Sequence, residues 1–310
     1  MKKTLSFAFI AAMVCGLQAA DRAEITFADA RIFPESLTST KNGDLYFGSL
    51  GQDAVYRAKA NETQATVWIK PKSNGLMTVL GVLADEKAGV LWVCASATGG
   101  RGGAPYVGET ALKAFNLKDA SFKASYAFPG NGLCNDITVA KDGTVYAADT
   151  IQGRVLRLKK GAGALDVWAS DPMLLATADG LALLEDGNLY INSVGQSTLM
   201  RIDVKADGSA GAITKLETSR PLMGPDGMRS VGKKTLLLVE GGRLDEVTIN
   251  GDNPNRAEIK VLKEGMTGIT AVTLTGGNAY VVEAKLNLRN DATKDPGPFK
   301  AMGIPYKAPK

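Results

Sequence analysis

The chain of 310 residues contains no histidine. Histidine is the side chain that titrates near neutral pH, ligates zinc, and acts as the base in Ser-His-Asp and Cys-His sites. Its absence excludes all of these arrangements. Any chemistry of this protein must therefore depend on carboxylates, amides, lysine, tyrosine or a hard metal ion.

Cysteine is also scarce, with three residues in the whole chain. Cys15 lies in the N-terminal segment, so only Cys94 and Cys134 belong to the remainder. In an exported protein two such residues can form a disulfide bond. Two buried thiols are the alternative, and composition alone leaves both interpretations open.

Neither a large net charge nor a long internal apolar run is present. The formal net charge is +4 at pH 7, which gives no argument for a nucleic-acid partner or for acidic lipid. Beyond the first twenty residues no apolar run is long enough to span a bilayer. We therefore expect a small-molecule ligand, and the sequence carries no signal for an oligomeric state.

The N-terminal residues 1–20 have the features of a secretory signal peptide. Lys2 and Lys3 supply the charged start, residues 4–17 the apolar stretch, and residues 18–20 a small-residue cleavage site. A lipid anchor at Cys15 is the alternative, although the residue before it is not small. We expect a periplasmic or secreted protein whose mature part is one domain over residues 21–310.

A hairpin motif recurs along the mature chain. The segments KNGDLYFGS at 41–49, KDGTVYAAD at 141–149 and EDGNLYINS at 185–193 share one template, and weaker copies lie at 87–94, 233–240 and 276–283. Asn-Gly or Asp-Gly between apolar runs is typical of a tight β-hairpin. The period of about 46 residues matches four short strands. The sequence thus predicts an all-β, six-bladed β-propeller of four-stranded antiparallel blades.

Two further segments complete this prediction. Residues 23–30 precede the first hairpin, and we expect them to pair with the last blade so that the ring has no open edge. Residues 98–106 form a glycine-rich insertion, for which an ordinary surface loop and a lid over the channel are the two interpretations.

Polar residues recur at one position of the repeat, where each innermost strand begins. In chain order this position holds Glu35, Gly81, Asn135, Asp179, Asp226 and Ile269. Equivalent positions in a propeller converge on one end of the central channel, so three carboxylates and an amide should meet there. Asp or Asn before Gly can also cap a turn, which is the alternative for each residue alone.

Carboxylates forced together repel one another, and a divalent cation removes that repulsion. The residues expected to hold it are Glu35, Asn135, Asp179 and Asp226. Calcium accepts six to eight oxygen ligands, amide oxygens among them, and magnesium or manganese also fits by ligand type.

A second ring of positions lies where the next strand returns to the same end. It contains Ser49, Ala95, Asp149, Ser193, Glu240 and Glu283. We expect these residues mainly to tie neighbouring loops together by hydrogen bonds. Orientation of the metal ligands or contact with substrate is the alternative.

The motifs Phe-Pro-Glu-Ser, Cys-Asn-Asp-Ile and Pro-Asp-Gly, in this order and spacing, resemble the senescence marker protein/gluconolactonase family. That family includes regucalcin and, more distantly, diisopropyl fluorophosphatase and the paraoxonases. The resemblance spans about residues 30 to 300 and implies a six-bladed propeller with a catalytic divalent metal. It implies that Glu35, Asn135 and Asp226 are metal ligands and that Asp226 is the general base.

Two departures modify this expectation. Asp179 stands where the family usually has Asn, and Leu133 stands where the sugar-lactone enzymes often have Arg. The resemblance therefore favours metal-dependent hydrolysis of a lactone or small ester, with Asp226 and Asp179 as catalytic residues, over hydrolysis of an aldonolactone. Phosphotriester hydrolysis needs the same groups. The alternative from another class is a non-catalytic propeller that binds a ligand or partner around a structural metal.

Overall fold

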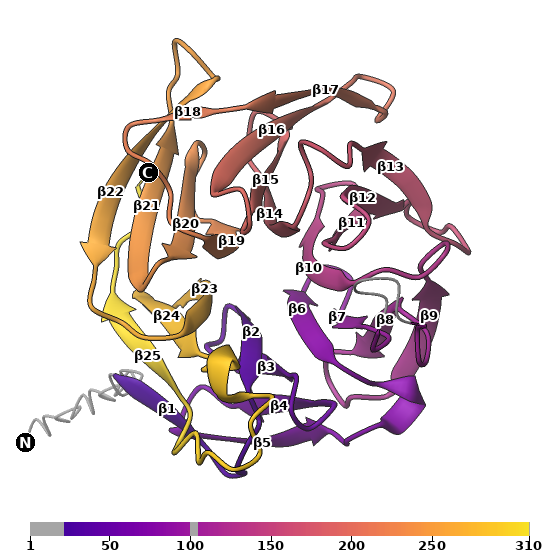
Figure 1. Ribbon diagram of the computed structural model, residues 1–310, viewed down its shortest axis with the longest axis vertical. Helices are drawn as coiled ribbons and strands as arrows, with labels where there is room; N and C mark the ends of the chain where they lie inside the picture. Colours follow the sequence, from indigo (N-terminus) through magenta and orange to yellow (C-terminus); the bar gives the residue numbers. More distant parts are fainter. Residues whose placement is uncertain (1–21, 100–104, 310) are drawn as a thin grey trace, which may run out of the picture.

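The computed structural model describes residues 22–99 and 105–309. These residues form β-strands and two short 3-10 helices, η1 (Ser73–Gly75) and η3 (Leu286–Leu288). The sheets stand around a central axis, and the strands nearest the centre are β2, β6, β10, β14, β19 and β23 (Figure 1). Within the described ranges no helix has the length and apolar character that a membrane crossing requires. The predicted signal peptide over residues 1–20 lies outside them.

Three sheets are plain four-stranded meanders in which consecutive strands pair antiparallel. The first contains β6 (Val79–Asp85), β7 (Val90–Ala95), β8 (Ala111–Asn116) and β9 (Phe122–Ala127). The second contains β10 (Cys134–Val139), β11 (Val145–Asp149), β12 (Arg154–Leu158) and β13 (Asp166–Ser170). The third contains β14 (Ala178–Leu183), β15 (Leu189–Ser193), β16 (Thr198–Val204) and β17 (Ala210–Lys215).

A fourth sheet has the same meander with one additional short strand at its outer edge. It contains β19 (Pro225–Ser230), β20 (Thr235–Glu240), β21 (Arg243–Ile249), β22 (Arg256–Lys263) and β18 (Glu217–Thr218). The short strand β18 pairs parallel to β22.

The remaining strands form one eight-stranded sheet that contains two meanders. One is β2 (Pro34–Ser39), β3 (Leu45–Ser49), β4 (Ala54–Ala58) and β5 (Gln64–Ile69); the other is β23 (Ile269–Thr275), β24 (Asn278–Glu283) and β25 (Lys300–Pro305). The N-terminal strand β1 (Glu24–Phe27) joins them, since it pairs antiparallel with β25 and parallel with β5. The predicted pairing of residues 23–30 with the last meander is thereby confirmed.

The predicted hairpins between first and second strands are present, and their turns explain the repeated glycine. Gly43, Gly143 and Gly187 have φ of 96°, 91° and 83°. Residues with a Cβ atom rarely adopt a φ of this size, whereas glycine does so at little cost in free energy. This explains the Asn-Gly and Asp-Gly pairs in these turns. The all-β class and the four-stranded antiparallel sheets are as predicted.

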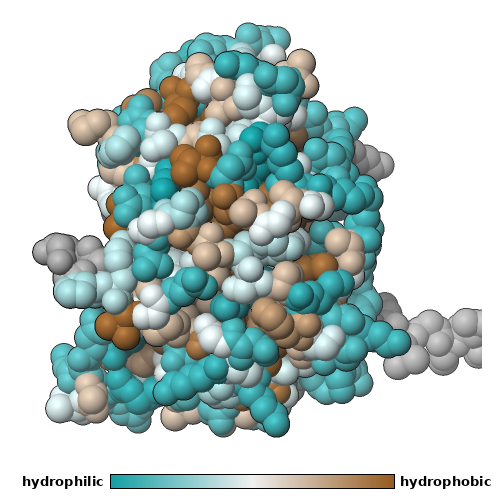
Figure 2. Space-filling view, turned by 90° about the vertical axis from the view of Figure 1, so that its right-hand side faces the viewer, coloured by the Kyte–Doolittle hydropathy of each residue, from teal (hydrophilic) through white to brown (hydrophobic). Residues whose placement is uncertain are grey.

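The hydrophobic core lies between the faces of neighbouring sheets rather than on the axis. Leu45, Phe47 and Tyr56, for example, are buried together with residues from the adjoining sheets. The side of the molecule shown in Figure 2 is mostly hydrophilic, with apolar residues scattered on it. Phe122 and Val167, on the outermost strands β9 and β13, are among the exposed apolar residues. Apolar side chains are therefore buried between the sheets, whereas the starts of the inner strands beside the axis carry polar groups.

Candidate metal centre

The polar residues at the starts of the inner strands lie together at one end of the axis. Glu35 is on β2, Asn135 on β10, Asp179 on β14 and Asp226 on β19. Glu35, Asp179 and Asp226 each offer a carboxylate oxygen, and these oxygens lie within 4.8 Å of one another. We refer to the four residues Glu35, Asn135, Asp179 and Asp226 as the axial cluster.

Each member of the axial cluster lies where its inner strand departs from regular pairing. The register shifts between Pro34 and Ser36 on β2, and similar shifts on β10, β14 and β19 cover the other three positions. A β-bulge turns a side chain away from the regular alternation of a strand. The bulges therefore turn the ligand-type side chains toward the axis.

A left-handed backbone conformation precedes three of these bulges. Phe33, Thr177 and Gly224, each two residues before a carboxylate of the cluster, have φ of 43°, 55° and 59°. Phenylalanine and threonine rarely adopt this conformation, and such strain persists mainly where the surrounding structure requires it. The backbone before each of these carboxylates therefore adopts a conformation that the surrounding structure must maintain.

The glycines after Asp179 and Asp226 allow the inner strands to approach closely. A Cβ atom on Gly180 would lie 2.5 Å from the carbonyl oxygen of Asp226, and one on Gly227 would lie 2.7 Å from that of Thr270. Only glycine fits at such distances. The Asp-Gly pairs, which could have been simple turn caps, bring neighbouring strands and their carboxylates together.

Hydrogen bonds orient Asn135 within the axial cluster. Its Nδ2 donates to Asp179 Oδ2 at 2.8 Å and to Thr150 Oγ1 at 3.1 Å. The amide nitrogen is therefore fully engaged, and the amide oxygen is the atom that remains for a ligand. Asp226 is held at its backbone, where its carbonyl accepts from Asn192 Nδ2 at 2.5 Å.

Burial and mutual repulsion disfavour the charged forms of all three carboxylates. Burial raises the pKa of Asp179 to about 7, with a further contribution from Asp136. Burial also raises the pKa of Glu35 and of Asp226, and the charge of Asp179 adds to both shifts. Within the described residues no lysine or arginine forms an ion pair with any of the three carboxylates. A buried, all-oxygen donor set without a counter-charge fits a hard divalent cation.

Two charged residues beside the cluster were not predicted as part of it. Arg229 Nη1 donates to Asp136 Oδ2 at 2.6 Å, across the channel from β19 to β10. Arg229 also lines a cavity of about 620 Å³ at the opposite end of the axis. This ion pair lies between the cluster and that opposite end. In the sequence only their positions pointed to the cluster. Asp136 follows Asn135 directly, and Arg229 lies three residues after Asp226, both on inner strands.

The second ring of positions holds the loops that precede the cluster residues. Ser49 and Ser193 donate to the carbonyls of Ile32 at 2.5 Å and Ala176 at 2.6 Å. Asp149 accepts from the Leu133 N–H at 3.0 Å, and Glu240 from the Met223 N–H at 2.6 Å. The predicted role of this ring in loop attachment is confirmed for the four sheets that contribute to the cluster.

Cys94 and Cys134 form a disulfide bond, with 5.1 Å between their Cα atoms. The bond joins β7 to β10 and lies directly before Asn135. It therefore fixes two neighbouring sheets to each other at the end of the axis that carries the cluster. The glycine-rich insertion between β7 and β8 is described only at its ends, where Thr98 pairs with Val107.

Comparison with solved structures identifies proteins of the same fold. A protein described as a gluconolactonase by a structural genomics consortium has a TM-score of 0.64 and 17% identity, over 93% of this chain and 94% of the other. A gluconolactonase from Xanthomonas campestris has a TM-score of 0.61 and 16% identity, over 91% and 89%. Luciferin-regenerating enzyme has a TM-score of 0.61 and 17% identity, over 91% and 94%.

The chain shares the fold of these proteins. The resemblance to the gluconolactonase family that the motifs indicated is thereby confirmed at the level of fold. No protein-family model matches the chain, and no curated protein sequence does so. Other chains with the same fold include lyases and a sugar dehydrogenase, so the chemistry must be argued from the site itself.

Proposed function

We propose that the protein is a divalent-metal-dependent hydrolase of a small lactone or ester. The observation that carries this proposal is the meeting of three carboxylate oxygens within 4.8 Å, from two buried residues and one half-buried residue on three separate strands, with no ion pair to a lysine or arginine of the described residues. Such a group is costly in a folded protein unless a cation joins it. Fold similarity to gluconolactonases supports the hydrolytic reaction class.

Glu35, Asn135, Asp179 and Asp226 would hold the metal, for which calcium is the first candidate and magnesium or manganese the alternatives. When bound, the cation would polarise the carbonyl of the substrate and stabilise the oxyanion that develops there. Asp179 orients Asn135 through their hydrogen bond, so the amide oxygen is presented to the site.

Asp226 is the proposed general base. It is less buried than Glu35, Asn135 and Asp179, so a water molecule and substrate have access to it. Oδ1 accepts from the Gly227 N–H at 3.0 Å, and the side chain also shares a hydrogen bond with Asp179. The ionised carboxylate would take the proton of the attacking water. Asp179 would share this proton, and direct nucleophilic attack by Asp226 is the alternative route.

We further propose that the ring has six blades and forms one domain. The eight-stranded sheet contains two meanders that only β1 joins, so it represents two blades beside the four separate sheets. The disulfide bond supports the proposed export to the periplasm or the exterior, where such bonds persist.

A panel of γ- and δ-lactones and aryl esters, assayed with calcium and then with chelator, tests the function. We expect hydrolysis of at least one substrate, loss of activity on chelation, and recovery when calcium is restored. Metal analysis of the purified protein should find close to one divalent ion per chain. Activity that persists in chelator would contradict the proposal.

One observation favours a second function, a non-catalytic module with a structural metal. Leu133 offers no charged group at the position where the sugar-lactone enzymes often have arginine. A protein that binds calcium with the same stoichiometry but hydrolyses no member of the panel would be assigned to this class.

A further inference from the structure

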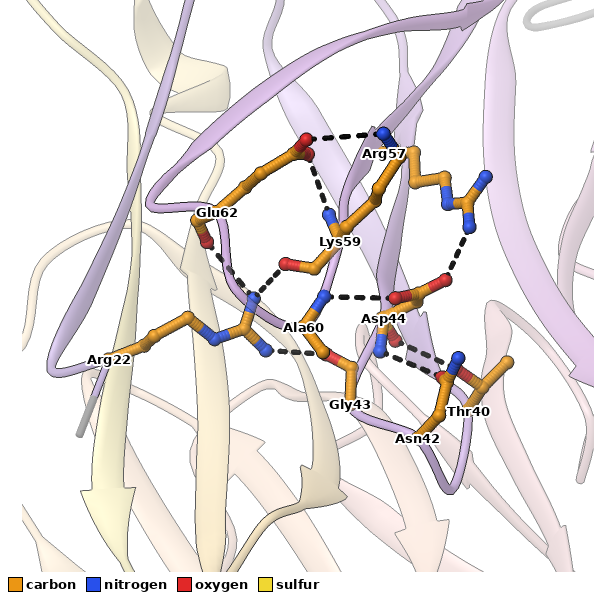
Figure 3. Close-up of polar contacts among 9 residues, drawn as sticks. All are labelled: Arg22, Thr40, Asn42, Gly43, Asp44, Arg57, Lys59, Ala60 and Glu62. Carbon is orange, nitrogen blue, oxygen red and sulfur yellow. Dashed lines mark hydrogen bonds and ion pairs between the residues drawn. The ribbon is translucent and has the colours of Figure 1, made fainter. Parts of the chain in front are cut away.

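An aromatic residue and an arginine face each other across the second and third strands of three sheets. The pairs are Tyr46 with Arg57, Tyr146 with Arg157, and Tyr190 with Arg201. Each arginine also forms an ion pair with an aspartate, namely Asp44, Asp166 and Asp203 respectively. Figure 3 shows the first of these, in which Asp44 accepts from Arg57 and from the Ala60 N–H. A charged pair therefore occupies this place in each of the three sheets.

The pair on β12 and β13 shows how this arrangement closes the junction with the next sheet. Arg157 is bonded to Asp166 at 2.6 Å and donates to the Gly208 carbonyl at 2.7 Å. Trp168 Nε1 donates to the same carbonyl at 2.9 Å. Gly208 belongs to the turn between β16 and β17, so arginine and indole together seal the space between two sheets.

The β6–β9 sheet lacks this charged pair. Trp92 faces Ala114, and Ala114 faces Ala124, where the neighbouring sheet has the arginine and its aspartate. Beside this sheet lies a cavity of about 260 Å³, lined by Trp92 and Tyr126 on one side and by the turn at residues 159–162 on the other. The junction between the β6–β9 and β10–β13 sheets therefore contains a cavity and, among the described residues, no charged pair of this kind.

The unpaired polar groups that line this cavity include three hydrogen-bond donors. Trp92 is only 8% exposed, and its Nε1 has no acceptor among the described residues. The ammonium groups of Lys159 and Lys160 likewise have no partner in the described part of the chain. Asp85 caps its own turn at the Ala88 N–H, and both oxygens of Asp142 bond to Thr144. The cavity therefore offers donors and positive charge to a ligand.

We propose that this cavity binds a small aromatic carboxylate, at a site separate from the axial cluster. The flat ring would lie against Trp92 and Tyr126, whose ring centroids are 6.2 Å apart, and the carboxylate would meet Lys159 and Lys160. Ligand pockets commonly enclose roughly 300–1,000 Å³, so this smaller cavity suits one or two rings.

The cavity and the axial cluster lie at opposite ends of β10. Asn135 is near the start of that strand, whereas Val139, its last residue, lines the cavity together with Gly143 in the following turn. Binding can therefore be measured without the metal. The proposal does not depend on the function of the metal centre.

Isothermal titration of 2-naphthoate into the protein in chelator tests the site, with 2-naphthamide as the uncharged analogue. We expect one naphthoate per chain and at least tenfold weaker binding of the amide. Lys159→Ala/Lys160→Ala should weaken naphthoate binding at least tenfold, whereas Lys205→Ala, an exposed lysine on the corresponding outer turn of the β14–β17 sheet, should leave it unchanged. Ala114→Arg, which restores the residue of the sister sheets, should abolish binding.

Three results would overturn the proposal: no naphthoate binding up to millimolar concentration, equal binding of the amide, or no effect of the lysine changes. Naphthoate binding that survives Ala114→Arg in a folded protein would place the ligand elsewhere. If that variant does not fold, the lysine variant still decides, because both lysines are exposed on a turn.

Discussion

Two groups of buried carboxylates in this molecule differ in whether the fold supplies their cation. Glu240 and Asp245, on β20 and β21, both bond to Arg220. The carboxylates of the axial cluster lie within 4.8 Å of one another and have no such partner among the described residues. Where a carboxylate only holds a loop, as Glu240 does, the sequence provides arginine. In the axial cluster no such arginine is found among the described residues, so a cation from outside the chain must balance the charge.

The pKa shifts show the same difference. Burial raises the pKa of Asp245 to about 6, and the guanidinium of Arg220 opposes that shift. Burial and the charge of Asp136 raise the pKa of Asp179 to about 7. Without metal, the axial cluster thus retains protons near neutral pH, and a divalent cation must displace them. A substitution in either group tests this difference.

The largest expected effect comes from neutralising the proposed base. Asp226→Asn should lower kcat by about 100- to 10,000-fold, the usual contribution of a general base. The fold should survive, because the change removes a repelling buried charge rather than a paired one. Steady-state kinetics on the best substrate of the lactone panel, with a thermal melt beside it, checks both expectations. Asp142→Asn, which changes a turn aspartate remote from the axis, is the control. Full turnover by Asp226→Asn would show that Asp226 is not the base.

In the second group, Glu240 and Asp245, the informative change is removal of the guanidinium of Arg220. Arg220→Met should destabilise the protein by about 3 kcal/mol or more, because Glu240 and Asp245 would be left buried and unpaired. Chemical denaturation measures this. Arg256→Met is the matched control: its pair with Glu217 is more than half exposed on both sides, and it should cost no more than about 1 kcal/mol. Equal effects of the two changes would show that burial does not distinguish these ion pairs.

Much of the fold could be predicted because its signals are local. The turns at Gly43, Gly143 and Gly187 repeat one template, and their period fixed the register at which Glu35 and Asp226 fall. The Arg229–Asp136 pair could not be found in this way. It depends on which inner-strand side chains cross the channel, and bulges that cannot be read from the pattern decide that direction.

The cavity beside Trp92 was missed for a related reason. Its lining brings Trp92 and Tyr126 of one sheet against residues 159–162 of the next, and no local pattern in the sequence shows that packing. The roles of Gly180 and Gly227 were ambiguous for the same reason. The turn-cap and close-packing interpretations differ only in how near the adjacent strand lies.

The smallest net effect concerns pH and tests the axial cluster without altering Arg220 or Asp226. The folded-state pKa of Asp179, about 7, lies above the ordinary value of 3.8 for aspartate. Its protonation therefore contributes stability that is fully present below pH 3.8 and is lost as pH rises through about 7. Metal-free protein should accordingly melt at a lower temperature at pH 8 than at pH 5, and Asp245, whose pKa is raised to about 6, contributes in the same direction. Calcium should reverse this trend, because it binds the deprotonated form and stabilises more at pH 8. Asp179→Asn isolates the contribution: the difference between wild type and variant should shrink as pH falls, and a difference that is constant from pH 5 to 8 would mean that Asp179 does not titrate there.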